Sequence, residues 1–488
     1  MSFRATESRN VWGRELRSAF TAVQVRAAEG ALMARLPEGT LMQRAAAGLA
    51  RRAALMLSTV YGSTVLLLIG TGDNGGDALY AGAILARRGA RVLVLPLADR
   101  VHAAGLAALK AAGGRVVAAP PVSADLVVDG MLGIGARPGL RDDAVAVLAA
   151  LPAAPVLAVD LPSGVDVDTG ALPGPSVSAD VTVTFGCLKP ALVAGPAAAR
   201  AGLVELVDIG LGPYLDGEPY VRVPDAADIA AVWRHPRPED DKYTRGVLGL
   251  AAGSIRYPGA AQLAVSGALA GPAGYVRYAG PAAADVRGRF PEVVTYDRAA
   301  DTGRVQAWTI GPGLGTDSTA TSELRSMLDD PVPACLDADA LTILARDPAL
   351  LAAREAPTVL TPHDREYARL NDGEAPGADR VAAARHLAER YDAVVLLKGH
   401  RTVVAAPDGR AYANPTGHAA LSTAGSGDVL AGLLGSLLAA GTEPAMAAVA
   451  AAYLHGLAGA RAAEGGPVSA TRVAAALRPV VRDLTGPA

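Results

Sequence analysis

The chain repeats one pattern along most of its length, a short apolar run that ends at glycine or a polar residue and is separated from the next run by helical sequence. Such runs occupy residues 64–69, 91–97, 126–129, 156–160, 181–185 and 204–209, and again 247–252, 307–310, 334–336, 358–360 and 393–397. Apolar runs of this length that alternate with helices predict parallel strands buried on both faces of a sheet. We therefore predict an α/β protein.

The pattern is interrupted between about residues 210 and 241, where prolines cluster and a charged stretch follows, Glu239-Asp240-Asp241-Lys242. A chain of 488 residues is also too long for one ordinary core. We predict a first domain over residues 1–212, a linker over 213–239 and a second domain over 240–488. The first is expected to be a Rossmann-like three-layer sandwich.

Composition narrows the range of functions. The net charge is −3 and no dense block of Lys or Arg occurs, so we expect no nucleic-acid partner. Cys187 and Cys335 lie far apart without metal-ligand spacing, which fits a reduced cytoplasmic setting and no structural zinc. The first twenty residues lack the apolar core of a secretory signal, and no run is apolar enough to span a membrane. We expect a cytoplasmic homo-oligomer.

A glycine-rich segment, Gly70-Thr71-Gly72-Asp73-Asn74-Gly75, follows the first apolar run and precedes a helix predicted from about Asp77 to Arg88. It matches G-x-G-x-x-G, so a dehydrogenase cofactor site is one interpretation, and a tight turn without ligand is another. Either way, backbone N–H groups at a helix N-terminus suit an anion.

Two later segments place polar side chains at the ends of strands in the same sheet. These segments are VDGMLGIG, with Asp129, and VDLPSGVD, with Ser163. The carboxyl ends of parallel strands form one crevice, so Asn74, Asp129 and Ser163 could bring three oxygens together. Oxygen ligands suit a hard cation, although each residue alone could be an ordinary turn or cap residue.

Residues 20–212 contain five characteristic segments, VRAAEGALMARLPEGTLMQRAAAG, GTGDNGGD, DGMLGIGARPGL, VDLPSGVDVDTG and FGCLKPAL. With these segments, this part of the chain resembles the NAD(P)H-hydrate epimerase domain. The resemblance implies a potassium ion held by Asn74, Asp129 and Ser163, and acid–base chemistry by Asp160 and Lys189. It also implies that the hydrated dinucleotide contacts Asp160 and the residues Asp73, Asn74, Gly75, Gly76, Asp77, Gly133, Ile134, Gly135, Ala136, Arg137, Pro138 and Gly139. The chain departs from the family at Asp73, where asparagine is usual, and at Ala78, where glycine is usual.

The second half contains Gly425-Ser426-Gly427-Asp428 directly before an apolar helix. Glycines and a helix N-terminus favour phosphate, and Asp428 could take a proton from a substrate hydroxyl. The alternative is an ordinary helix start with an acidic first turn. Companion motifs end four predicted strands, GPGLG after Ile310, DADAL after Leu336, TPH after Leu360 and KGHRT after Leu397.

Together with DKYTRG and GSIRYPGA, these motifs make residues 240–480 resemble the ribokinase-like superfamily, closest to ADP- or ATP-dependent NAD(P)H-hydrate dehydratase. The resemblance implies that Asp428 is the general base and that Ala260, Gly313 and His363 touch the hydrated dinucleotide. It implies that the adenine nucleotide is bound by Lys398, Gly399, His400, Arg401, Thr402, Gly425, Ser426 and Gly427. The family's TPHPGE is TPHDRE here, its GNPG is Gly417-His418-Ala419-Ala420, and its GGSGD is AGSGD.

These resemblances predict a bifunctional nicotinamide-nucleotide repair enzyme that epimerises hydrated NADH and NADPH and dehydrates the S form with ADP as phosphate donor. Mg²⁺ and K⁺ are the expected ions. Three alternatives remain, a ribokinase-like kinase of a small alcohol such as a vitamin, a decayed nucleotide-binding protein and, more weakly, a dehydrogenase. The sequence does not decide between ADP and ATP.

Overall fold

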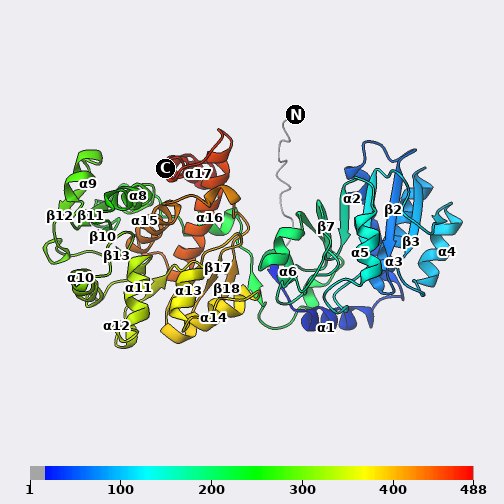
Figure 1. Ribbon diagram of the computed structural model, residues 1–488, viewed down its shortest axis with the longest axis horizontal. Coiled ribbons are helices and arrows are strands. Elements are labelled where there is room, and N and C mark those ends of the chain that lie inside the picture. Colours follow the sequence, from blue (N-terminus) through cyan, green and yellow to red (C-terminus); the bar gives the residue numbers. More distant parts are fainter. Residues whose placement is uncertain (1–16, 487–488) are drawn as a thin grey trace. The chain divides into compact units, whose positions relative to one another are not determined.

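The computed structural model describes residues 17–486, which divide into two compact units at Arg222/Val223. Figure 1 shows both units, each with helices around a sheet. The segment 213–239, predicted as a linker, contains strand β9 (Val221–Arg222) and helix α7 (Ala226–Val232), which packs on the C-terminal helices α16 and α17. The residues before 17, where we expect no secretory signal, lie outside the described part of the chain.

The first unit is built on a parallel sheet with the strand order β4-β3-β2-β5-β6-β7-β8. The order reverses direction at β2, and the carboxyl ends of β2 and β5 therefore open a crevice at the switch point. A short antiparallel pair, β1 with β9, lies outside this sheet. The strand bounds are β1 Ser18–Ala19, β2 Thr64–Ile69, β3 Arg91–Pro96, β4 Arg115–Val116, β5 Leu126–Gly130, β6 Val156–Val159, β7 Val181–Phe185 and β8 Leu203–Val207.

Helices cover both faces of this sheet, as continuous apolar strands require. Along β2, Val65 and Leu67 belong to one buried cluster, whereas Leu66 and Leu68 belong to another on the opposite face. This confirms the three-layer sandwich. The helices are α1 Ala22–Met33, α2 Thr40–Met56, α3 Asp73–Arg87, α4 Ala103–Ala111, α5 Asp142–Ala149 and α6 Pro190–Val193, with 3₁₀ turns η2 Pro196–Arg200 and η3 Gly212–Tyr214.

The prediction that the helix after β2 begins near Asp77 is wrong. Helix α3 begins at Asp73, with Gly72 as its N-cap, so most of the glycine-rich segment forms the first helical turn. Close packing explains the glycines, because a Cβ on Gly76 would lie 2.7 Å from Met42 Cε and one on Gly75 would lie 2.8 Å from Gly70 O. The segment brings the start of α3 against the strand ends.

The second unit has the strand order β18-β17-β16-β15-β14-β13-β10-β11-β12. The strands from β16 to β12 are parallel, and β17 and β18 add an antiparallel hairpin beside β16. The four strands predicted to end in polar motifs, β13 to β16, are neighbours in this sheet. The bounds are β10 Val247–Ala251, β11 Tyr275–Ala279, β12 Val294–Tyr296, β13 Ala307–Ile310, β14 Ala334–Leu336, β15 Thr358–Leu360, β16 Val394–Leu397, β17 Val403–Ala405 and β18 Ala411–Ala413.

Small residues let helices α8 and α15 pack with their backbones almost in contact. A Cβ on Gly432 would lie 1.9 Å from Ala264 O, and one on Gly267 would lie 2.0 Å from Val429 O. This confirms the close packing expected of the small-residue helices after Gly427. The helices are α8 Pro258–Leu269, α9 Ala283–Arg289, α10 Ser318–Leu328, α11 Asp339–Arg346, α12 Ala349–Ala352, α13 Asp364–Leu370, α14 Arg380–Tyr391, α15 Ser426–Ala439, α16 Pro444–Ala463 and α17 Ala470–Thr485, with 3₁₀ turns η4 Ala299–Asp301 and η5 Ala419–Leu421.

Two candidate active sites

The first candidate site lies at the carboxyl ends of β2, β5 and β6. Asn74, in the first turn of α3, donates from Nδ2 to the carbonyls of Val159 (2.6 Å) and Leu132 (3.0 Å), and so ties the helix start to the two neighbouring strand ends. Its Oδ1 lies 2.5 Å from where a Cβ on Gly133 would stand. The loop 133–139 therefore lies directly against Asn74.

Asp129 and Ser163 form a buried pair beside it. Asp129 is fully buried and accepts from Ser163 Oγ (2.6 Å), Ser163 N (2.8 Å) and Met131 N (3.3 Å). Burial raises the pKa of Asp129 to about 6, although these hydrogen bonds oppose the shift. No side-chain cation among residues 17–486 balances this carboxylate, so an added cation would find partly uncompensated negative charge there.

Asp160 and Lys189 meet at the ends of β6 and β7. Lys189 Nζ lies 2.5 Å from Asp160 Oδ1 and also donates to Thr184 Oγ1 and Phe185 O, both at 3.0 Å. Burial acts to lower the pKa of Lys189, but the carboxylate of Asp160 outweighs it and the pKa rises. Asp160 has a left-handed backbone (φ 65°), a conformation seldom adopted except by Gly, Asn and Asp.

Two further carboxyls, Glu29 and Asp77, surround this ion pair, and Glu29 was not predicted from the sequence. Burial raises the pKa of Glu29, on α1; the charge of Lys189 opposes this rise and the charge of Asp160 adds to it. The pKa of Asp77 lies well above its usual value, first through burial and then through Asp160 and Asp73. Glu29 stands in a motif that carries the family resemblance, but only the docking of α1 onto the sheet reveals its place in the site.

The second candidate site is organised by Lys398 at the end of β16. Lys398 Nζ lies 2.7 Å from Asp337 Oδ1 and 3.6 Å from Glu366 Oε2, and Thr361 Oγ1 donates to the same Asp337 oxygen at 2.8 Å. Burial acts to lower the pKa of Lys398, but Asp337 and Glu366 outweigh it and the pKa rises. The ammonium group of Lys398 therefore stays charged. It lies beside the loop 425–428, because a Cβ on Gly427 would be 3.6 Å from Nζ.

Asp428 stands in the first turn of α15, after the left-handed N-cap Gly425. Burial, then the charge of Asp337, raises the pKa of Asp428 to about 7, although Lys398 opposes the shift. A carboxyl with this pKa exchanges a proton readily near neutral pH, which suits a general base. An acidic residue that only stabilises the start of a helix does not have to be buried, so the burial of Asp428 favours a role in catalysis.

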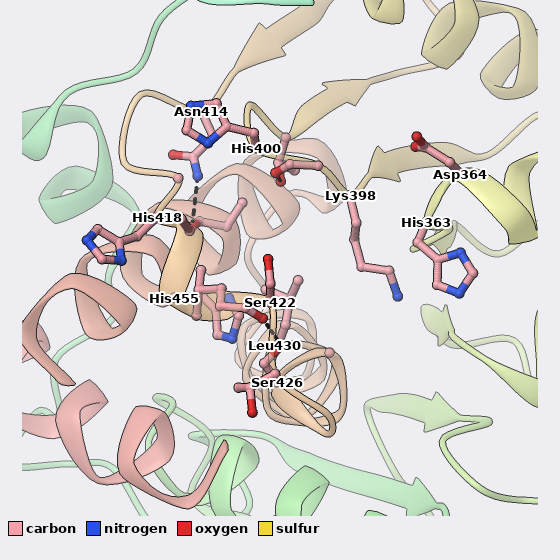
Figure 2. Close-up of a pocket in the computed structure, with 18 of the residues that line it drawn as sticks. His363, Asp364, Lys398, His400, Asn414, His418, Ser422, Ser426, Leu430 and His455 are labelled. Carbon is pink, nitrogen blue, oxygen red and sulfur yellow. Dashed lines mark hydrogen bonds between the residues drawn. The ribbon is translucent and has the colours of Figure 1, made fainter. Parts of the chain in front are cut away.

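A cavity of about 1130 Å³ opens between these elements. Figure 2 shows Lys398 and His363 on one side of it and His418 and His455 on the other. The cavity is lined by seven of the residues that, according to the resemblance, bind the nucleotide or the substrate. These are His363, Lys398, Gly399, His400, Thr402, Ser426 and Gly427. Arg401 does not line the cavity and instead donates to Pro415 O at 2.6 Å. Ala260 and Gly313 also lie outside the cavity lining but are close to each other, because a Cβ placed on Gly313 would lie 2.9 Å from Ala260 Cβ.

The TPHDRE segment contains one residue that matches the dehydratase pattern, His363, and one that departs from it, Asp364, and each has a local role in the structure. His363 caps α13 by accepting from the backbone of Arg365 (3.1 Å) and Glu366 (3.3 Å). Asp364 forms an ion pair with Arg380 at 2.9 Å, and Arg380 also donates to Lys398 O at 2.7 Å. Asp364 thus helps to hold the strand end that carries Lys398.

Comparisons with known proteins agree with both halves. The family model described as NAD(P)H-hydrate dehydratase matches residues 248–478, and the one described as YjeF-related protein N-terminus matches residues 38–191. The Bifunctional NAD(P)H-hydrate repair enzyme Nnr of Mycobacterium leprae is 49% identical over 89% of this chain and 93% of that protein. The chain belongs to the family of bifunctional NAD(P)H-hydrate repair enzymes. The repair enzyme of Mycobacterium tuberculosis is 48% identical over 82% of this chain and 86% of that protein.

A solved structure agrees with the fold of the second unit. A ribokinase-like superfamily protein from Enterococcus faecalis matches with a TM-score of 0.50 and 24% identity, over 56% of this chain and 99% of that one. This match shows the ribokinase-like fold alone. Membership of the repair-enzyme family favours the predicted repair function over the kinase, decayed-scaffold and dehydrogenase alternatives.

No helix within residues 17–486 is both long and apolar enough to cross a membrane. Within the same range, no group of three or more His, Cys, Asp or Glu side chains is arranged to hold a metal ion. A site built from Asn74, Asp129 and Ser163 is of a different chemical type, because two of its three ligands are amide and hydroxyl oxygens.

Proposed function

We propose that this chain repairs hydrated NADH and NADPH with two sites. The first unit interconverts the R and S hydrates, and the second dehydrates the S hydrate with a phosphate taken from ADP, ATP being the alternative donor. The observation that carries the second activity is Asp428, with a pKa of about 7, at the head of α15 beside Gly427 and Lys398. Both activities also rest on membership of the repair-enzyme family.

In the second site, Asp428 takes the proton from the substrate hydroxyl as its oxygen bonds to the terminal phosphorus of the nucleotide. The bond from that phosphorus to the bridging oxygen breaks, and AMP leaves if ADP is the donor. The N–H groups at the start of α15 and the ammonium of Lys398 stabilise the developing negative charge. The bond from the ring carbon to the phosphate oxygen then breaks, inorganic phosphate leaves with the electron pair, and loss of a proton from the adjacent ring carbon restores the double bond.

Mg²⁺ would neutralise phosphate charge when bound with the nucleotide. Because no group of three acidic, His or Cys ligands is preformed within residues 17–486, the ion would be held largely by phosphate oxygens, with Asp337 or Glu366 as the nearby carboxylates. Asp337 already accepts from Lys398 and Thr361. These residues therefore fit an ion that arrives with its nucleotide.

In the first site, Asp160 and Lys189 are proposed to move protons at the hydrated carbon. Their buried ion pair holds a carboxylate and an ammonium 2.5 Å apart, so a proton acceptor and a proton donor face one region. Asp73 and the loop 133–139 would contact the dinucleotide. A homo-oligomeric state and a cytoplasmic location stay predictions.

The experiment that tests the dehydratase proposal uses the purified full-length chain with the S hydrate, Mg²⁺ and either ADP or ATP. We expect the near-ultraviolet absorbance of the dihydronicotinamide to return, with release of inorganic phosphate. Mass spectrometry separates this result from that of a small-molecule kinase, which would leave a stable phosphorylated product. Accumulation of such a product, or no reaction with either nucleotide, would contradict the proposal.

We further propose that Asn74, Asp129 and Ser163 hold a potassium ion. Because the folded pKa of Asp129 is about 6, against about 4 in an unfolded chain, its ionisation lowers the stability of the fold as pH rises through this window. The loss is complete above about pH 6 and absent below about pH 4. A bound cation would offset the loss where the carboxyl is ionised.

We therefore expect KCl, compared with choline chloride at equal ionic strength, to raise the melting temperature of the first unit by about 2–4 °C at pH 8 and by less at pH 5. Differential scanning calorimetry would measure this difference. Asp129→Asn removes the charge and should remove the potassium effect. Equal melting temperatures in the two salts at pH 8 would contradict a potassium site here.

A further inference from the structure

Arg26 is a cation beside the first site that the proposed chemistry does not use. It lies on α1, and its Nη2 donates to Ile134 O at 3.4 Å. A Cβ placed on Gly135 would lie 2.7 Å from the same nitrogen. The guanidinium therefore rests on the loop 133–139, the loop that also lies against Asn74.

Gly135 leaves room for this guanidinium. The backbone φ of Gly135 is not positive, so its conformation does not itself require glycine. Apart from its chain neighbours, a Cβ at this position would meet two atoms within 4 Å, Nη2 at 2.7 Å and Cζ at 3.8 Å, and both belong to Arg26. The missing side chain at position 135 thus allows Arg26 to lie directly on the loop.

Most of the hydrogen-bonding capacity of Arg26 is free. The residue is exposed, its bond to Ile134 is long, and no ion pair is found for it among residues 17–486. A guanidinium carries several N–H donors in one plane, so a single long bond leaves the others available. An anion that reaches the loop can therefore bind to them.

The interior of the first site offers a phosphate little positive charge. Asp129 and Asp160 are buried carboxyls, and Lys189 is 1% exposed with its donors already bonded. A dinucleotide brings a diphosphate and so adds further negative charge. The loop 133–139 has two exposed cations to receive it, its own Arg137 and Arg26 from α1.

We propose that Arg26 binds a phosphate group of the hydrated dinucleotide and so positions this substrate at the first site. The planar fork of a guanidinium matches two oxygens of one phosphate. The inference rests on the proposed function of the first unit, which places the dinucleotide against the loop 133–139. Arg26 takes no part in the proton transfers assigned to Asp160 and Lys189.

The test compares Arg26→Met with the unmodified full-length protein. The R hydrate is supplied without ADP or ATP, so the second site cannot consume the S form, and conversion to the S hydrate is followed by chromatography. We expect the KM of Arg26→Met to rise about 10-fold, the lower end for a hydrogen bond to a charged group, because the guanidinium is exposed. The kcat should stay within about twofold, since a contact made equally in the bound substrate and the transition state affects KM alone.

Three substrates identify which phosphate is bound. The hydrate of reduced nicotinamide mononucleotide has only the phosphate on the nicotinamide side, that of NADH has the diphosphate, and that of NADPH adds a 2′-phosphate. A KM that rises for all three indicates the nicotinamide-side phosphate. A rise for both dinucleotides indicates the adenosine-side phosphate, and a rise for the NADPH hydrate alone indicates the 2′-phosphate.

Two further variants and a control test the position of the guanidinium. Arg26→Lys keeps the charge but loses the fork, so its KM should lie between those of the unmodified protein and Arg26→Met. Gly135→Ala displaces the guanidinium, so it should raise the KM of the unmodified protein and add little to that of Arg26→Met. The control is Arg35→Met, at an exposed arginine just after the same helix whose guanidinium lies 5.7 Å from the ring of Tyr214, and its KM should not change.

The effect of salt separates phosphate binding from a structural role. Salt screens an exposed contact between guanidinium and phosphate, so the difference in KM between Arg26→Met and the unmodified protein should shrink as NaCl is added at constant KCl. If Arg26→Met leaves the KM of all three hydrates unchanged, or if its effect does not depend on salt, the Arg26 inference is wrong while the proposed function stands. If the unmodified protein does not interconvert the hydrates faster than they interconvert spontaneously, the proposed function of the first unit fails, and this inference fails with it.

Discussion

Replacing Asp428 with asparagine is expected to lower the kcat of dehydration by about 10²- to 10⁴-fold, the usual contribution of a general base. Asparagine keeps the shape of the side chain but cannot take a proton from the substrate hydroxyl. The carboxyl is suited to that step because burial and Asp337 raise its pKa to about 7. Single-turnover measurements with saturating S hydrate and nucleotide would report the chemical step directly.

The matched control is Asp285→Asn, which makes the same substitution at an exposed acid in the first turn of another helix of the second unit, α9. It should leave kcat within about twofold, as surface substitutions usually do. Nucleotide binding by the Asp428 variant should stay close to that of the unmodified protein. Full turnover by Asp428→Asn would exclude this residue as the base.

Replacing Lys189 with methionine is expected to destabilise the first unit by about 3–5 kcal/mol, because it leaves the carboxylate of Asp160 buried without its partner. Lys189 is 1% exposed, and its three donors all have acceptors at the ends of β6 and β7. Hydrogen exchange followed by mass spectrometry of peptides from these strands would measure the loss locally, since two units need not unfold together.

The control is Arg51→Met, which removes an exposed cation that forms an ion pair with Glu205 in the same unit. Exposed pairs contribute about 0–1 kcal/mol, so exchange in β6 and β7 should change little. If the Lys189 and Arg51 variants lower the free energy of unfolding of the first unit equally, the buried ion pair does not stabilise the first site in the way proposed. Asp160→Asn tests its chemistry separately, because asparagine tolerates the left-handed backbone at this position.

Most strands of both sheets could be predicted from the sequence because each is a short apolar run with a polar or glycine-rich end, whereas β4, β11 and β12 were not predicted. The motifs after Ile310, Leu336, Leu360 and Leu397 end four neighbouring strands, and this is why local sequence indicated a shared site. The hairpin of β17 and β18 was missed, although Pro407-Asp408-Gly409 between two apolar runs is a turn signal.

Other parts of the sites depend on contacts that no local pattern contains. Glu29 resembles any acid on a helix until α1 docks beside Lys189. His455 is a single polar residue in an alanine-rich helix, and only the packing of α16 against α15 and η5 shows that it lines the cavity. Conversely, Arg401 fits a phosphate-binding pattern in the sequence, but the structure directs it to the carbonyl of Pro415.

We propose that one chain carries out both steps of the repair, and a mixture of the two hydrates tests this. The purified full-length protein is given a mixture of R and S hydrates of NADH with Mg²⁺ and excess ADP, and recovery of the dihydronicotinamide absorbance is followed to its end. We expect complete recovery in the unmodified protein at a rate well above spontaneous epimerisation, and recovery of the S share alone at that rate when Lys189 is replaced. A plateau at the S share in the unmodified protein would contradict the claim.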